Sequence, residues 1–284
     1  MSILYSNLMV TKMQCPFLSG KMLENHENQR YTTTQKGYTM QVTTLLRRSP
    51  WIVMGGRTLL FLTFQAFIAL LFLVLGSRQA WSSASAWWTL FVTFTNFTCL
   101  YFLVRLFKAD NRKYRDIFKF ERPSLKKDTL VFAGSLLLII PISMAPNLLL
   151  AKVLFGGMQI PMGMFLLPLP KWAIYSVALV LFPLTQALVE LAFYFLYCMP
   201  KIEEKTDNAV LAYCSCCVFL GFQHSMIPFL PDWRFILWRA LMFLPFAFFV
   251  GALLRWRPRM LPYLALLHLF MDFSAAIMYV TGVY

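Results

Sequence analysis

The sequence predicts an all-α fold, a polytopic membrane helix bundle of about seven transmembrane helices with one re-entrant segment. Of its 284 residues, 59% are hydrophobic and only 13% are charged, whereas soluble domains carry about 25% charged residues. Apolar runs of about 20 residues, the length that crosses a bilayer, recur along the chain. The basic residues gather in short clusters between these runs, as they do in membrane proteins.

Residues 1–50 contain no long apolar run and are rich in Thr, Gln and Asn. They also lack the charged, apolar and small-residue pattern of a signal peptide. We therefore expect a mobile polar cytoplasmic tail over 1–50. Residues 51–284 are expected to form a single transmembrane domain.

Seven spans are expected, in order along the chain. Their approximate limits are 58–76, 87–107, 129–153, 172–197, 209–227, 233–254 and 260–280. The first follows the basic residues Arg47, Arg48 and Arg57. The second opens with Trp87 and Trp88, residues typical of a membrane interface.

The segments between the spans fall into three kinds. Residues 108–128 are densely charged and predict a solvated loop with a short amphipathic piece, and 201–208 predict a second charged loop. A basic turn over 255–259 precedes the last span. Residues 156–170 are apolar but hold three prolines and three glycines, a pattern that favours a re-entrant or interfacial segment.

The basic clusters also predict the orientation in the membrane. With alternating spans, twenty-one of the 26 Lys and Arg residues fall on the side of the N-terminus. By the positive-inside rule this side is cytoplasmic. Short loops and the lack of a eukaryotic retention signal favour a bacterial plasma membrane.

The net charge of +14 raises the question of nucleic-acid binding. The basic residues, however, lie beside apolar runs and do not alternate with a stacking platform. We expect the lipid bilayer, and no nucleic acid, as their partner. The six cysteines are expected to be free thiols, because most lie in or at the ends of apolar runs.

Polar residues within the spans are the strongest functional signal, because ionisable groups inside a membrane are costly. Gln186 and Glu190 lie four residues apart on one helix face, and His268 and Asp272 do the same in the last span. The remaining members of this set are Tyr194, His224 and Arg239.

Each of these residues has a structural alternative. Gln186 could join helices by hydrogen bonds, and Glu190 could be the buried partner of Arg239. His224 could be a packing histidine, and His268 with Asp272 a local pair. Three helices that each carry such groups favour one shared cavity over separate burials.

A shared site requires Glu190, His224 and His268 to lie at one level, within direct or water-bridged reach. At about 1.5 Å per residue, Glu190 and His268 lie about 11 and about 12 Å from the expected cytoplasmic ends of their spans. The same count places His224 about 22 Å deep. We nevertheless expect all three to meet.

Three short motifs in the last third of the chain carry a family resemblance. The sequence HLFMD runs from His268 to Asp272, FLGFQH ends at His224, and VELAFY contains Glu190. Together they resemble the motifs H-x-x-x-N/D, F-x-x-x-H and E-E-x-x-x-R of the CAAX-protease and bacteriocin-processing family of intramembrane endopeptidases. Val189 replaces the first glutamate and Tyr194 the arginine. Leu220 stands where the second motif has its phenylalanine, with Phe219 and Phe222 on either side.

The resemblance implies a bundle like that of the prenyl endopeptidases, with the motifs in a core of about 172–280. It implies that Glu190 activates water with His224 as its partner. His268 with Asp272 would polarise the scissile carbonyl or orient the imidazole. Gln186 would position substrate or water, as in a subgroup with a Q-x-x-x-E motif, with Tyr194 and Arg239 in the same positioning class.

The expected function is therefore hydrolysis of a peptide or membrane-protein substrate in a cytoplasm-facing membrane cavity. The alternative is a catalytically inactive member acting as a scaffold, immunity factor or transporter-like partner, since the first glutamate is missing. No metal cofactor is expected, because the resemblance implies a glutamate mechanism. Two histidines and two carboxylates leave a zinc site as the alternative.

Overall fold

The computed structural model describes residue 41 and residues 44–47 and 49–281 of the chain. Every regular element in these ranges is helical, and seven helical spans are long and apolar enough to cross a membrane. The predicted all-α, polytopic bundle is thus confirmed. Most of the predicted tail lies outside the described residues, and a compact unit begins at Leu46.

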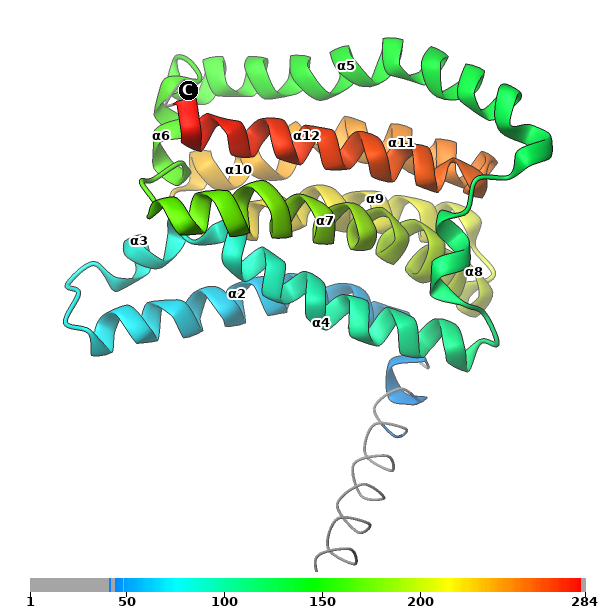
Figure 1. Cartoon of the computed structure of the whole chain (residues 1–284), viewed down its shortest axis with the longest axis horizontal. Coiled ribbons are helices and arrows are strands. Elements are labelled where there is room, and N and C mark those ends of the chain that lie inside the picture. Colours follow the sequence, from blue (N-terminus) through cyan, green and yellow to red (C-terminus); the bar gives the residue numbers. More distant parts are fainter. Residues whose placement is uncertain (1–40, 42–43, 48, 282–284) are drawn as a thin grey trace, which may run out of the picture. The chain divides into compact units, whose positions relative to one another are not determined.

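Figure 1 shows the helices of this unit packed side by side. Those within the seven spans are α2 (Pro50–Val74), α4 (Trp88–Ala109), α5 (Leu125–Phe155), α7 (Phe182–Leu191) with α8 (Met199–Thr206), α9 (Ala209–Gln223), α10 (Trp233–Met242) with α11 (Leu244–Trp256), and α12 (Leu261–Thr281). The first span begins eight residues before its expected start. Arg57, expected in the flanking tail, therefore lies inside α2 and is 1% exposed.

Two shorter helices lie between the spans, α3 (Ala80–Ser85) and α6 (Gln159–Phe165). The segment expected to be re-entrant contains α6, which is too short to cross a membrane. It follows Gly156, whose positive φ of 83° ends α5. Pro161, Met162 and Phe165 of α6 are buried against the bundle.

The fourth span continues as one helical rod from Ala173 to Thr206, so the expected charged loop over 201–208 is largely wrong. The Lys and Glu residues of the expected loop are good helix formers and continue the helix as α8. This helix ends at Asp207, which has a left-handed φ of 51°. The side chain of Asn208 then accepts a hydrogen bond from the Leu211 N–H and caps α9.

Ion pairs join several helices at one end of the bundle, which we call the basic end. Asp128, at the start of α5, pairs with Arg257 and Arg259 before α12, at 3.1 and 3.0 Å. Glu203 of α8 pairs with Arg255 of α11 at 2.7 Å. These contacts bring the start of α5 and α12 and the end of α8 and α11 together (Figure 1).

Aromatic rings join the opposite end, which we call the α6 end. Trp88, at the start of α4, packs on Phe165 of α6, Phe182 of α7 and Tyr279 near the end of α12, with ring centroids 5.0 to 6.4 Å apart. Phe165 also contacts Trp238 of α10. Ion pairs thus connect the helices at the basic end, and aromatic contacts connect them at the α6 end.

Close helix packing near the basic end depends on Gly251 of α11. A Cβ atom there would lie 2.6 Å from a ring carbon of Phe195 and 3.0 Å from the Cys217 sulfur. We expect Gly251→Ala to lower the free energy of unfolding by about 1–3 kcal/mol through overpacking. Thermal unfolding of the purified protein measures this effect.

The matched control is Gly134→Ala in the exposed middle of α5, where nothing lies within 4 Å of the added atom. We expect that variant to unfold at the wild-type temperature or above it, because alanine favours a helix. Equal loss in both variants would contradict the packing argument.

Candidate active site

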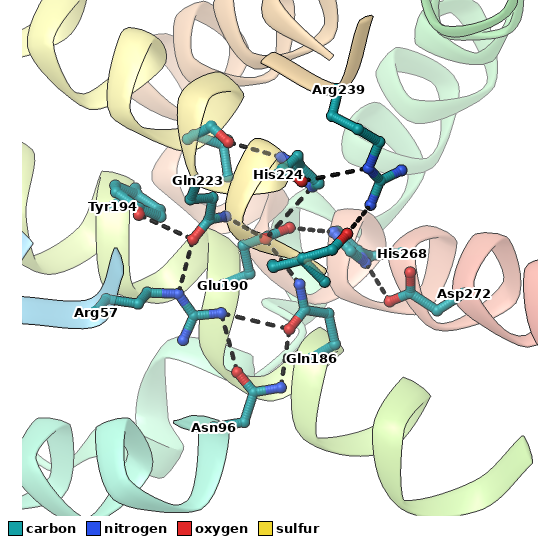
Figure 2. A network of polar contacts seen from close by, with 12 residues as sticks. Arg57, Asn96, Gln186, Glu190, Tyr194, Gln223, His224, Arg239, His268 and Asp272 are labelled. Carbon is teal, nitrogen blue, oxygen red and sulfur yellow. Dashed lines mark hydrogen bonds and ion pairs between the residues drawn. The ribbon is translucent and has the colours of Figure 1, made fainter. Parts of the chain in front are cut away.

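Glu190 lies at the centre of a polar network inside the bundle (Figure 2). It belongs to α7, which is flanked by the π-helical segments Ala173–Leu181 and Ala192–Cys198, a helix type frequent at functional sites. Its carboxylate is nearly fully buried. It accepts hydrogen bonds from Gln186 at 2.7 Å, from Gln223 at 2.5 Å and from His268 at 2.5 Å.

His268 lies between two carboxylates. Its Nε2 bonds Glu190 and its Nδ1 bonds Asp272 at 2.8 Å. Each bond requires one proton, so the three groups together hold two protons and a net charge of −1. This arrangement fixes the orientation of the imidazole ring and leaves neither ring nitrogen free.

His224 occupies the first position of a short 3-10 segment after α9. Its Nδ1 lies 2.8 Å from the Leu220 carbonyl oxygen, which can only accept, so Nδ1 carries a proton. In the neutral ring Nε2 then presents a lone pair, 3.9 Å from Oε1 of Glu190. That gap is too long for a direct hydrogen bond and suits a water that contacts both groups.

The prediction that Glu190, His224 and His268 share one level is therefore confirmed. The mismatch between Glu190 and His224 came from ending the fourth span too early: counted from Thr206, Glu190 lies about 24 Å along its helix, against about 22 Å for His224 from Ala209. His268 lies only about 10 Å from the start of α12 at Leu261, so α12 begins nearer to the site than the other two helices do.

Arg57 is the main site residue that the sequence prediction missed. Its guanidinium donates to Gln223 Oε1 at 3.0 Å, to Asn96 Oδ1 at 2.9 Å and to Gln186 Oε1 at 3.3 Å. Because arginine only donates, it turns the two glutamine oxygens toward itself and their NH₂ groups toward Glu190. Its positive charge also balances the −1 of the Glu190, His268 and Asp272 group.

The other predicted positioning residues lie around this network. Tyr194 donates to Gln223 Oε1 at 2.9 Å and so supports the same amide. Arg239 is not the partner of Glu190. It donates to the carbonyl oxygens of His224 at 3.2 Å and Ile227 at 2.7 Å.

A cavity of about 390 Å³ adjoins the network. Glu190, His224, His268 and Arg239 face it, while most of its wall is apolar. The wall is built from α6 and from the parts of the neighbouring helices nearest the α6 end. Its apolar members include Trp88, Met144, Met158, Phe165, Phe182, Trp238, Met271 and Met278.

The position of the cavity bears on two expectations from the sequence. The half of the bundle between Glu190 and the basic end is filled by buried apolar side chains. The cavity wall lies toward the α6 end and not toward the basic end. The greater length of the fourth span places Glu190 farther from the basic end than the sequence count does.

Comparison with known proteins gives no identification. No family model, no curated protein and no solved structure matches the chain. The geometry of the site thus has to carry the functional argument. Within the residues that the structure describes, no group of three or more His, Cys, Asp or Glu side chains is placed to hold a metal ion.

We expect Arg57→Met to destabilise the protein by about 2 kcal/mol, because it removes the donor to the buried Asn96 Oδ1 and the positive charge beside Glu190. Thermal unfolding in detergent measures this loss. Arg255→Met is the matched control, since Arg255 is part of a surface pair with Glu203 and should change little. An Arg57→Met protein as stable as wild type would contradict the bridging role.

Proposed function

We propose that this integral membrane protein is an intramembrane endopeptidase of the CAAX-protease and bacteriocin-processing family. We place it in a bacterial plasma membrane, with the N-terminus and the basic end in the cytoplasm. The observation that carries the proposal is the 3.9 Å gap between Glu190 and Nε2 of His224 at the cavity wall. Two proton acceptors at this spacing can hold one water molecule.

Hydrolysis at this position needs only the groups present. The water donates its protons toward the Glu190 carboxylate and Nε2 of His224, and its oxygen forms a bond to the scissile carbonyl carbon as one proton is taken up. The carbonyl electron pair moves onto its oxygen. Collapse of the tetrahedral intermediate breaks the C–N bond, and the captured proton passes to the leaving amine.

Donors for the developing oxyanion are also available on the cavity wall. Trp238 Nε1 donates to Asn147 Oδ1 at 2.9 Å, so the Asn147 NH₂ group is turned away from the indole. Arg239, the residue after Trp238, supplies a guanidinium on the same cavity wall. We propose that Asn147 and Arg239 polarise the scissile carbonyl. His268 holds Glu190 in its orientation.

Loss of the family's first glutamate is compatible with this scheme. Val189 is fully buried in the apolar core and is absent from the cavity wall. A carboxylate at that position would not reach the cavity in this arrangement. Gln186 and Gln223 instead support Glu190, which acts as the single carboxylate base.

The direct test uses the full chain in lipid nanodiscs with a pool of peptides that contain apolar segments. In water enriched in ¹⁸O, wild type is expected to place one ¹⁸O atom in each new carboxyl terminus, read by mass spectrometry. His224→Ala should lose this activity, whereas His26→Ala should keep it. Equal behaviour of wild type and folded His224→Ala would leave the polar network as a structural element of an inactive scaffold.

A further inference from the structure

The side from which a substrate reaches Glu190 can be deduced from the two ends of the bundle. Nine Lys and Arg residues lie between 105 and 127 and three more between 255 and 259, all at or next to the basic end. In the described part of the chain, the α6 end holds Arg78, Lys171, Lys152 in the last turn of α5 and Arg234 in the first turn of α10, and the buried Arg239 lies nearby on the cavity wall. This asymmetry favours a cytoplasmic basic end.

The core closes the route from the basic end to the site. Along the fourth span, the successive turns after Glu190 carry Tyr194, Cys198 and Ile202, each 0% exposed. On the facing helices, Leu254 and Leu264 are each 1% exposed in the same apolar cluster. Close packing of this kind leaves no passage for a peptide.

The cavity extends in the other direction. Leu220 and Phe246 line it at the level of the polar network, and Trp88, Met158 and Met278 line it near the α6 end. Its wall includes Met144, Asn147 and Leu148 of α5, the span with the smallest buried share. The open path to Glu190 therefore begins in the half of the bundle near the α6 end.

We infer that the site takes its substrate from the extracytoplasmic side of the membrane. The substrate class is a peptide segment of an exported or membrane-anchored protein, with large apolar side chains next to the scissile bond. Those side chains match the methionine- and aromatic-lined wall. The inference rests on the proposed function for its substrate, whereas the side of access can be tested without any catalysis.

Thiol labelling in cells tests the side of access. Ala275→Cys places a thiol on the cavity wall, Ser274→Cys places one next to it on the exposed side of α12, and Glu204→Cys places one on the exposed surface of α8. A charged, membrane-impermeant methanethiosulfonate is added to spheroplasts or to inverted membrane vesicles. Labelling is measured as the gain over wild type, which corrects for the natural cysteines.

We expect Ala275→Cys to react at least about 10-fold faster in spheroplasts than in inverted vesicles, and Glu204→Cys to show the opposite preference. Ser274→Cys should react slowly from both sides if it faces lipid. Faster labelling of Ala275→Cys in inverted vesicles would overturn the inference, as would its protection from both sides.

A second arm links access to catalysis. A peptide cleaved by the purified protein is added outside spheroplasts, and wild type is compared with Glu190→Gln. Cleavage by wild type alone supports the inference, and cleavage only when the peptide is inside overturns it. If labelling follows the expected pattern but no peptide is cleaved by the purified protein, the proposed function fails while the side of access stands.

Discussion

Glu190→Gln is expected to lower kcat for peptide cleavage by about 10³-fold, within the range that a positioned general base contributes. The amide cannot take a proton from water, and its NH₂ group would face donors from Gln186, Gln223 or His268. The measurement is initial-rate cleavage by the protein in nanodiscs, with thermal unfolding of each variant.

Glu204→Gln is the matched control, because Glu204 is exposed on α8 and pairs with nearby Lys201. It should cleave at the wild-type rate. A folded Glu190→Gln protein that retains more than about a tenth of the wild-type kcat would remove Glu190 from the role of base.

His268→Ala is expected to lower kcat by about 100-fold, because Glu190 loses the imidazole that fixes Oε2. Asp272→Asn should cost less, about 10-fold, since an asparagine oxygen can still accept from Nδ1 of His268. Steady-state kinetics on one peptide give both values.

The order of these two effects is the informative part. If Asp272→Asn costs more than His268→Ala, Asp272 takes part in proton transfer and does not merely orient the ring. Asp116→Asn, at an exposed carboxylate that pairs with Lys119, is the control and should leave kcat unchanged.

The fold class could be predicted from composition and run length, and the number of spans follows from the same pattern. The ends of the spans could not. In α8 the residues Lys201, Glu203 and Glu204 gave the segment the composition of a loop, yet they continue the helix beyond the apolar run. Charge marks where a helix leaves the bilayer and not where it stops.

The site was partly visible in the sequence, because the i, i+4 pairs Gln186 with Glu190 and His268 with Asp272 each lie on one helix face. Their meeting with His224 required three helices to pack, which no local pattern encodes. Arg57 was taken for a flanking basic residue because it directly precedes an apolar run. Asn96 could have been found from the sequence, because it is a polar amide in the middle of an apolar membrane span.

The short chain of contacts from α5 to His224 has a mechanical consequence. Asn147 holds Trp238, and the next residue, Arg239, holds the backbone carbonyl of His224. The least buried of the seven spans is thus coupled through three side chains to a proton acceptor of the proposed reaction. A shift of α5 would therefore move His224 relative to Glu190 and change the room for a water between them.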